Sequence, residues 1–229
     1  MIKKLFNRLI PLFFSLKRIM TKVKRLDDPE FKAFPHIRRF SRECIITEKI
    51  DGTNAQIFIT PIHKNHYNNS MISYFYGEDA STWGVYAGSR SRWLTPGKHT
   101  DNYGFAQWVK DNVDELKKLG PGRHYGEWYG QGINRNYGLK EKRFVLFNVD
   151  KYGKMLASDF PKCVTIVPIL RTGILSSDLI HEALQDLIAN GSKLVPGYMR
   201  PEGIVIFHCA SNILLKKTIE QDEQPKGKI

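Results

Sequence analysis

A lysine within residues 48–54, which read Glu-Lys-Ile-Asp-Gly-Thr-Asn, has the neighbours that a nitrogen nucleophile requires. A neutral lysine amine can attack an electrophilic centre, and burial or nearby cations can lower a lysine pKa enough to free that amine. Asp51 follows Lys49 by two residues, so both side chains share a strand face if the strand extends that far. Gly52 permits close approach of a ligand to the backbone. The alternative is a surface lysine beside a hairpin turn, because Lys-x-Asp-Gly occurs by chance in roughly one chain in twenty of this length.

Four later segments each combine a strand-like apolar pattern with a charged or aromatic side chain that such a nucleophile would need. They are residues 125–130 with Glu127, residues 143–149 with Phe147, residues 201–207 with Glu202, and residues 214–218 with Lys216 and Lys217. Taken singly, each segment also fits a structural interpretation: an edge carboxylate, a core phenylalanine or a solvated lysine face.

The order of these five segments resembles the nucleotidyltransferase motifs of the covalent-lysine superfamily, which contains the ATP-dependent DNA and RNA ligases and the mRNA capping enzymes. The string at residues 48–54, together with residues 87–94 and 220–227, is most similar to RNA ligases of the second T4 type and their phage and bacterial relatives. The resemblance implies an ATP-dependent RNA ligase. Such an enzyme forms lysyl-AMP at Lys49, transfers the AMP to a 5′-phosphate end of RNA and seals that end to a 3′-hydroxyl.

The same resemblance implies a role for individual residues. Lys49 would be the nucleophile, and Glu202, with Asp51 close by, would hold Mg²⁺ or Mn²⁺, largely through water. The other implied roles are contacts with the nucleotide or the RNA end: Glu48 with the adenine amino group, Phe147 on the adenine face, Glu127 with the ribose, Arg90 with the ribose or phosphates, Gly52 beside the nucleotide, Lys216 with the α-phosphate, and Asn54 with the incoming 5′-phosphate. Because guanine presents an acceptor where adenine presents its amino group, Glu48 would favour ATP over GTP.

The last motif departs from the family pattern, which commonly has a Lys-x-Lys pair on this strand. Position 214 is Leu here, and Lys216 and Lys217 are adjacent. Neighbouring strand residues face opposite sides, so only one of the two lysines is placed to reach a phosphate. The distance to residues 218–220 favours Lys216.

Two other functional classes compete with the RNA ligase interpretation. One is a minimal DNA ligase or a capping-type guanylyltransferase, and residues 48–54 together with the expected absence of an OB-fold domain argue against both. The other is a non-catalytic module that binds nucleotides or RNA ends, and the intact Lys49, Glu127, Glu202 and Lys216 argue against it. Whether the partner is RNA alone or also DNA stays open.

The alternation of short strands with a few helices predicts an α+β fold. Helices are expected over about 105–119 and 176–191, and strands near 44–47, 55–60, 123–129, 143–150, 164–169, 203–208 and 212–219. The resemblance implies two mainly antiparallel sheets flanked by helices, with the nucleotide in the groove between them, as in an adenylyltransferase or ATP-grasp-like ligase core. The chain ends ten residues after Ile219, so we expect no OB-fold domain and no separate C-terminal domain.

Charge divides the chain into an arm, residues 1–26, and a nucleotidyltransferase domain, residues 27–229. The net charge is +12, and the arm alone holds eight Lys or Arg and no Asp or Glu. The arm is expected to be disordered, to be a targeting segment or to reflect an over-long start, with Met20 as the alternative start.

The remaining sequence features bear on where the protein acts. Three widely spaced cysteines argue for a reducing compartment. The sequence has no run of about 18 uncharged apolar residues, so no membrane span is expected. We expect a monomer without a stable membrane partner in the cytoplasm of a bacterial or phage-infected cell. A mitochondrial location, addressed by the arm, is the alternative.

Overall fold

The computed structural model describes residues 31–62, 69–220 and 222 of the chain. The chain divides into two units, Met1–Ile37 and Arg38–Ile229. In the first unit, described residues 31–37 are exposed and have no regular secondary structure. The basic arm predicted for residues 1–26 lies outside the described residues. The architecture below is that of the second unit.

The first sheet has four antiparallel strands in the order β11-β10-β1-β9. Their bounds are Glu43–Lys49 for β1, Ile169–Ile174 for β9, Gly203–His208 for β10 and Ile213–Thr218 for β11. Helix α5, Ser177–Asn190, packs on one face, because alternate residues of β1 and β10 turn apolar side chains towards it. The Ser176 side chain caps this helix by accepting a hydrogen bond from the backbone N–H of Leu179.

The second sheet has seven strands in the order β3-β4-β2-β6-β7-β8, with β5 paired to β4. Their bounds are Thr53–Pro61 for β2, Met71–Tyr76 for β3, Thr82–Gly88 for β4, Trp93–Leu94 for β5, Gly122–Gly130 for β6, Lys142–Leu146 for β7 and Val164–Ile166 for β8. All pairings are antiparallel except that of β7 with β8. The mainly antiparallel character predicted from the sequence is therefore confirmed.

Helices cover the second sheet less than predicted. The helix expected over about 105–119 is interrupted into α2, Phe105–Asp111, α3, Val113–Leu116, and the 3₁₀ turn η1, Lys117–Leu119. The break falls at Asn112, whose side chain donates to the carbonyl oxygen of Trp108 at 2.8 Å and so competes with the helical backbone pattern. The apolar periodicity survives the break, because Phe105, Val109 and Leu116 all lie in the core of this sheet.

Several other boundaries differ from the prediction. The strand expected over 143–150 ends at Leu146, because Asn148 caps a short helix, α4, Val149–Tyr152. The strand expected near 164–169 is divided between the two sheets, with β8 in one and β9 in the other. Strands β3, β4 and β5 were not predicted.

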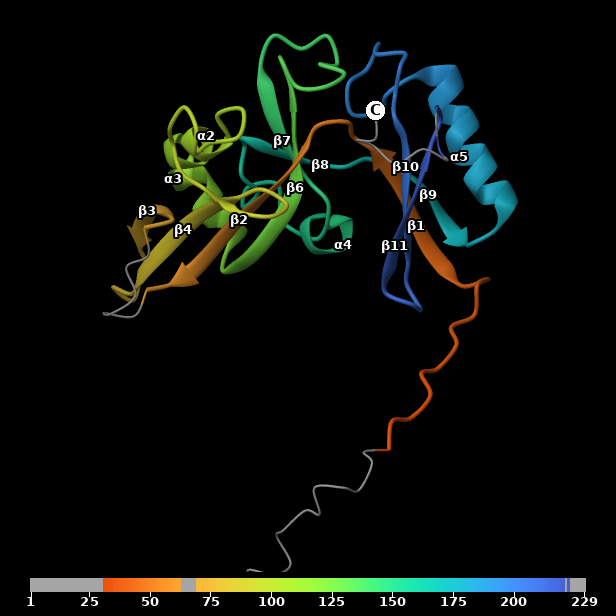
Figure 1. The fold of residues 1–229 in the computed structure, drawn as a ribbon, viewed down its shortest axis with the longest axis horizontal. Coiled ribbons are helices and arrows are strands. Elements are labelled where there is room, and N and C mark those ends of the chain that lie inside the picture. Colours follow the sequence, from red (N-terminus) through yellow and green to blue (C-terminus); the bar gives the residue numbers. More distant parts are fainter. Residues whose placement is uncertain (1–30, 63–68, 221, 223–229) are drawn as a thin grey trace, which may run out of the picture. The chain divides into compact units, whose positions relative to one another are not determined.

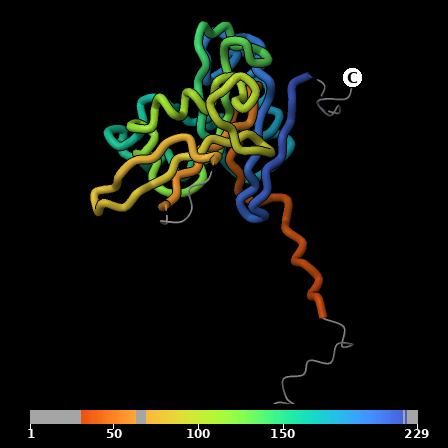
Figure 2. The backbone as a smooth tube through the Cα atoms, turned by 60° about the vertical axis from the view of Figure 1, so that its left-hand side comes forward, coloured from red at the N-terminus to blue at the C-terminus, as the bar shows by residue number. Residues whose placement is uncertain are grey.

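The segment that contains Lys49 crosses from one sheet to the other. Strand β1 ends at Lys49 in the first sheet and β2 begins at Thr53 in the second, as the orange ribbon of Figure 1 and the tube of Figure 2 show. A small buried cluster packs at this crossing and consists of Ile50, Tyr129, Tyr137, Val145 and Val167. Residues 49–52 are thus held between two separately packed cores.

None of the helices in the described residues has the length and apolar character that crossing a membrane requires.

Candidate active site

Lys49 and Glu202 form a close ion pair at the ends of neighbouring strands. Lys49 is the last residue of β1 and lies opposite Gly203, the first residue of β10. Its Nζ lies 2.7 Å from Oε2 of Glu202, and the exposed side-chain fractions are 18% for Lys49 and 2% for Glu202. A charge-assisted hydrogen bond of this kind, largely removed from water, fixes the direction of the amine. The pairing joins two of the predicted site residues that are 153 positions apart in the chain.

Gly203 brings this end of β10 against β11. Its φ is 152°, and a Cβ at this position would collide with the backbone of Lys217 and Thr218. Only glycine fits without displacing β11. Glycine after Glu202 is therefore part of the geometry that seats the carboxylate beside Lys49.

The strand register distinguishes Lys216 from Lys217. Lys216 lies opposite Val205, which itself lies opposite Thr47, two residues before Lys49. Residues directly opposite in a sheet share a face, so Lys216 is on the face that carries Lys49. Lys217 lies opposite Ile204, on the face packed against α5, and its Nζ pairs with Oδ2 of Asp222 at 3.1 Å.

Under the lysyl-AMP mechanism that the sequence resemblance implies, Lys216→Ala is expected to lower the rate of lysine adenylylation by about tenfold to a hundredfold, because it removes a positive charge from the sheet face of Lys49. Lys217→Ala is the matched control and is expected to react at close to the wild-type rate. Single-turnover labelling of the two variants with ATP measures both rates. The reverse ranking would place the functional lysine one residue further along β11.

Asp51 is engaged by a loop that connects β6 and β7. Its Oδ1 accepts a hydrogen bond from Asn134 Nδ2 at 3.0 Å, and its Oδ2 accepts one from Arg135 Nε at 3.1 Å. Arg135 also donates to the carbonyl oxygen of Arg200 at 3.0 Å, just before β10. Together with Tyr198 these residues line a hollow of about 520 Å³. The loop therefore connects the residues after Lys49 to those before Glu202.

Sequence reasoning missed Asn134 and Arg135. The available signal was a Gly- and Asn-rich loop, residues 130–138, directly after the strand that carries Glu127. Asn134, Asn136 and Tyr137 adopt positive φ, which compacts the loop against the end of β1. An arginine within such a turn beside a predicted site deserved the same weight as the motif residues.

Glu127 and Asn54 lie side by side next to Gly52. They are opposite each other in the pairing of β2 with β6, so they share a face of the second sheet. A Cβ on Gly52 would lie 2.9 Å from Cγ of Glu127 and 2.9 Å from Cβ of Tyr129. Close contact with β6 is thus the structural reason for glycine here, and the predicted approach of a ligand to Gly52 stays a prediction.

Phe147 and Arg90 both lie at ends of strands in the second sheet. Phe147 follows β7, and its backbone N–H donates to the carbonyl oxygen of Tyr125 at 3.0 Å. Its side chain is 38% exposed, unlike Phe144 and Leu146, which are fully buried. Arg90 is exposed in the turn between β4 and β5. Phe147 therefore has a face available to a ligand, and its predicted stacking on adenine stays a prediction.

Glu48 lies on the other face of β1 from Lys49. Its side chain is buried, and Oε2 accepts hydrogen bonds from the backbone N–H groups of Lys193 and Leu194 at 2.8 and 3.0 Å. Burial raises the pKa of this carboxyl above the ordinary value of 4.5, and the hydrogen bonds from Ser192, Leu194 and Lys193 oppose that rise in part. The structure thus gives Glu48 a role in holding the 192–194 turn, and its contact with adenine stays a prediction.

Glu48→Gln is expected to gain stability relative to the wild type as the pH rises. A raised pKa means that the folded protein holds a proton that the unfolded chain has lost, so wild-type stability falls as pH rises through the window above 4.5. The glutamine variant lacks this loss. The difference in Tm between variant and wild type should be more positive at about pH 7 than at about pH 4. The expected shift is roughly 2–4 °C for each kcal/mol by which the free energies of unfolding differ.

The pH dependence of that difference carries the test, because the buried amide of glutamine also shifts Tm by an amount independent of pH. Glu43→Gln, at the exposed start of the same strand, is the matched control and should show no such trend. A constant difference between Glu48→Gln and wild type would contradict a raised pKa at Glu48.

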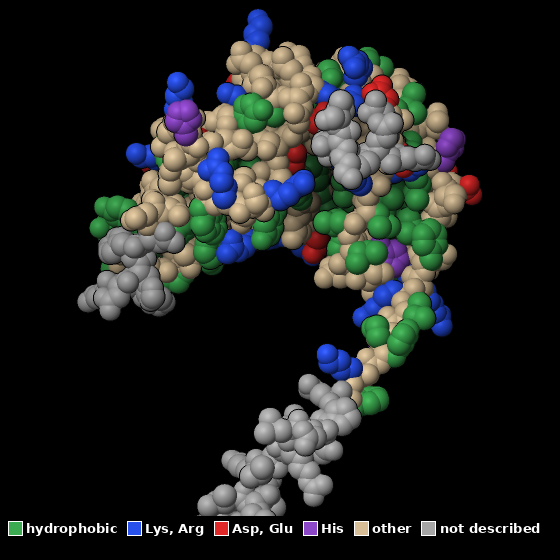
Figure 3. All heavy atoms as spheres, viewed as in Figure 1, with side chains coloured by type: hydrophobic (Ala, Val, Ile, Leu, Met, Phe, Trp, Pro, Cys, Tyr) green, Lys and Arg blue, Asp and Glu red, His purple; other side chains and the backbone are tan. Residues whose placement is uncertain are grey.

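No cluster of three or more His, Cys, Asp or Glu side chains with metal-binding geometry exists in the part of the chain that the structure describes. Glu202 is the carboxylate next to Lys49, and both oxygens of Asp51 accept hydrogen bonds from the 130–138 loop. Figure 3 shows acidic side chains in the recess between the two sheets, with Lys and Arg side chains on the surface beside it.

The model of the family described as RNA ligase matches residues 42–218, which include both sheets and the residues above. No curated protein matches the chain.

The similar solved structures include RNA ligases from Naegleria gruberi. One, a mutant with ATP and Mn, has 19% sequence identity and a TM-score of 0.49, and the match covers 84% of this chain and 58% of that one. A second, with pyrophosphate, has 19% identity and a TM-score of 0.47, covering 78% of this chain and 50% of that one. A third, an apo mutant, has 21% identity and a TM-score of 0.45, covering 78% and 50%. The chain thus spans about half the length of these structures.

Proposed function

Because the chain belongs to the RNA ligase family, we propose that it is an ATP-dependent RNA ligase whose nucleophile is Lys49. The observation that carries the proposal is the Lys49–Glu202 ion pair of 2.7 Å, on the same sheet face as Lys216. An amine, a buried carboxylate and a second cation on one surface are what transfer of a nucleotidyl group to lysine requires.

In the first step the neutral Nζ of Lys49 attacks the α-phosphorus of ATP. A nitrogen–phosphorus bond forms, the bond from that phosphorus to the bridging oxygen breaks, and pyrophosphate leaves. Starting from the ammonium, the lysine nitrogen loses two protons to solvent, one before the attack and one as the phosphoramidate forms. Lys216, on the same sheet face as Lys49, would offset the charge on the nucleotidyl group during its transfer, and Glu202 would orient the amine until the nucleotide arrives.

In the second step an oxygen of the RNA 5′-phosphate attacks the phosphorus of lysyl-AMP. The nitrogen–phosphorus bond breaks, the lysine amine takes up a proton, and the 5′ end becomes a 5′–5′ pyrophosphate with AMP. In the third step the 3′-hydroxyl of the other end attacks the 5′-phosphate phosphorus, gives up its proton and displaces AMP. Asn54 and Glu127, side by side next to Gly52, would contact the incoming end and the nucleotide.

A divalent cation, Mg²⁺ or Mn²⁺, belongs to this proposal. One buried carboxylate, Glu202, fits a cation that keeps most of its water and takes its other oxygens from phosphates. Glu202 would hold it, with Asp51 contributing at most through water, since Asn134 and Arg135 already bind its oxygens. When bound, the cation supplies positive charge to the phosphates and lowers the proton affinity of a neighbouring amine.

The proposed substrates are ATP and RNA with 5′-phosphate and 3′-hydroxyl ends. The experiment is incubation of the full-length protein with Mg²⁺ or Mn²⁺ and nucleotide labelled at the α-phosphate, followed by denaturing electrophoresis. A labelled band from ATP that resists denaturant and is released by acid supports lysyl-AMP. Equal labelling by GTP would favour a capping-type guanylyltransferase.

Sealing is tested separately with nicked and single-stranded substrates of RNA and of DNA. Joining of RNA ends but not DNA ends supports the RNA ligase, whereas the opposite preference favours a minimal DNA ligase. Labelling without any sealing would limit the activity of this chain to nucleotidyl transfer.

A further inference from the structure

The second sheet has an open face, opposite α2 and α3, that continues from the candidate active site. Along β2, Ala55, Ile57 and Ile59 turn into the core, so Asn54, Gln56 and Phe58 turn to the open face. The pairing with β6 places three cross-strand residue pairs, here called rungs, on this face: Asn54 with Glu127, Gln56 with Tyr125, and Phe58 with Arg123.

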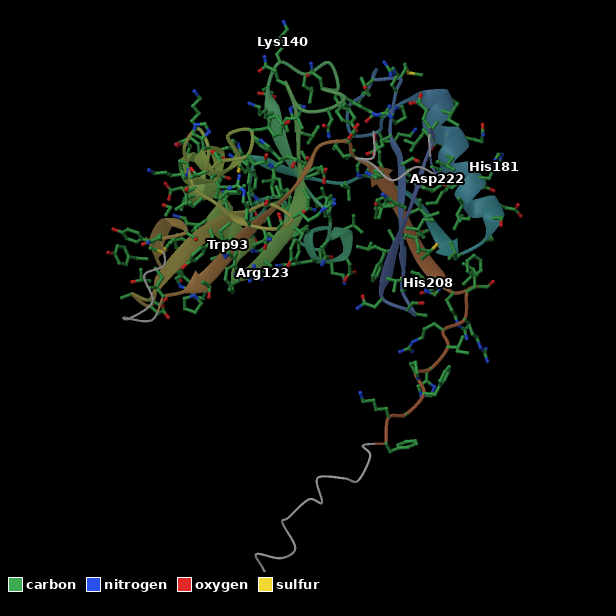
Figure 4. All side chains as sticks on the ribbon, viewed as in Figure 1. Trp93, Arg123, Lys140, His181, His208 and Asp222 are labelled. Carbon is green, nitrogen blue, oxygen red and sulfur yellow. The ribbon has the colours of Figure 1, made fainter. Side chains whose placement is uncertain are left out.

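The third rung carries a cluster of rings with an arginine over it. The ring of Phe58 stacks on Trp93 with centroids 6.0 Å apart and planes 22° apart, and Tyr86 lies 5.5 Å from Trp93. The guanidinium carbon of Arg123 lies 4.2 Å from the centroid of Phe58 and 5.3 Å from that of Trp93. We call Phe58, Trp93 and Arg123 the aromatic platform; Tyr86 is only 8% exposed and supports Trp93 by packing against it. Figure 4 shows Trp93 and Arg123 close together on this sheet.

A polar contact fixes the orientation of Arg123. Its Nη1 donates to Oε1 of Gln56 at 2.9 Å, although the residue is exposed. The guanidinium is thus held over the Phe58 ring and keeps donors for a ligand, since an arginine has five N–H groups. An exposed arginine used only for solubility would not need this anchor.

The platform lies within a short distance of the proposed nucleotide contacts. Phe58 lies four positions after Asn54 on β2, which corresponds to about 13 Å along a strand. Tyr125 occupies the rung between them and is 48% exposed. Rings and an arginine therefore continue along the sheet from the place where a 5′ end would be held.

We propose that the aromatic platform and Tyr125 bind unpaired bases of a single-stranded RNA next to the end that is being joined. The proposal rests on the proposed function for the identity of the ligand. Aromatic side chains stack on bases of any sequence, and Arg adds cation–π and phosphate contacts, which together make the usual single-strand binding surface. A duplex hides its base faces within its stack, so it would not use the rings in this way.

A protein partner fits this surface less well. The centre of the face carries Gln56 and Arg123 between the rings, and the rung towards the active site carries Glu127. Protein interfaces are depleted of charge at their cores, whereas nucleic-acid surfaces combine cations with rings.

The test is binding of the full-length protein, without ATP, to a fluorescent single-stranded RNA that has a 5′-hydroxyl and so cannot be adenylylated. Anisotropy is measured at elevated salt, which weakens the contribution of the basic arm equally in all variants. Arg123→Gln and Tyr125→Leu are each expected to raise Kd by about tenfold. Tyr125→Phe keeps the ring and should bind like the wild type, and Arg123→Lys keeps the charge but should lose most of the stacking.

Lys140→Ala is the matched control, because Lys140 is exposed and lies at the top of Figure 4, away from Trp93 and Arg123. It should leave Kd unchanged. Wild-type affinity in both Arg123→Gln and Tyr125→Leu overturns the proposal. If the variants lose affinity equally for single-stranded RNA and for a blunt RNA duplex, the proposal is also overturned, since an equal loss would reflect charge alone.

The two proposals fail in different assays. If the wild type does not form lysyl-AMP but the variants still lose affinity for single-stranded RNA, the proposed function fails and the platform stands. If lysyl-AMP forms and the variants bind as the wild type does, the platform fails and the proposed function stands.

Discussion

Lys49→Ala is expected to reduce the labelled protein formed from ATP to background. The variant removes the amine that would form the nitrogen–phosphorus bond and that pairs with the buried Glu202. The measurement is denaturing electrophoresis after incubation with ATP labelled at the α-phosphate.

Lys49→Arg is the sharper form of this test. Arginine keeps a positive charge for Glu202, so it preserves the pairing of a carboxylate that is only 2% exposed, but a guanidinium is not a nucleophile at neutral pH. We expect a folded protein with wild-type Tm within a few degrees and no label. A label retained in the arginine variant would assign the nucleophile to another residue.

Glu202→Gln is expected to slow lysine adenylylation by roughly 10²–10³-fold, the range typical for loss of one electrostatic group in an active site. Glutamine has almost the same shape and can still accept a hydrogen bond from Lys49, so the strands should keep their register. What is lost is the negative charge that aligns the ammonium and that would hold the divalent cation. Single-turnover labelling at increasing Mn²⁺ measures the rate and the metal requirement together.

Glu43→Gln, at the exposed start of β1, is the matched control for the loss of one carboxylate from this sheet. It should react at the wild-type rate. If Glu202→Gln also reacts at that rate and with unchanged dependence on Mn²⁺, Glu202 has a structural role only, and the metal must be held elsewhere.

The sequence was most informative where function imposes a residue at a fixed place in a strand. The ordered motifs located the two strands that bring Lys49 and Glu202 together, and alternation along β11 predicted that Lys216 and Lys217 face opposite sides, as the register shows. The two main helical segments were found because apolar side chains recur with a helical period.

What could not be predicted depends on contacts between distant segments. The buried carboxylate of Glu48 accepts hydrogen bonds from the backbone N–H groups of Lys193 and Leu194, which are 145 and 146 positions away. Nothing near Glu48 in the sequence indicates this environment. Arg135 gains its importance only when its loop folds back onto Asp51, 84 positions earlier. Strand β5 has only two residues, the pairing of β3 with β4 is irregular, and residues 84–88 of β4 are all buried, so none of the three shows a clear period-two pattern.

The crossing of residues 49–52 between the sheets bears on how the protein unfolds. Each sheet has its own apolar core, and the two are joined by Ile50, by its neighbours in the small cluster and by the Arg135 contacts to Asp51 and to the backbone of Arg200. Cores linked in this way lose their structure in one cooperative transition, because opening the crossing exposes surface from both. Lys49 therefore lies in a backbone segment whose amide hydrogens should exchange only when the whole second unit opens. A nucleophile on a segment of that kind keeps its position through the many smaller motions that loops permit.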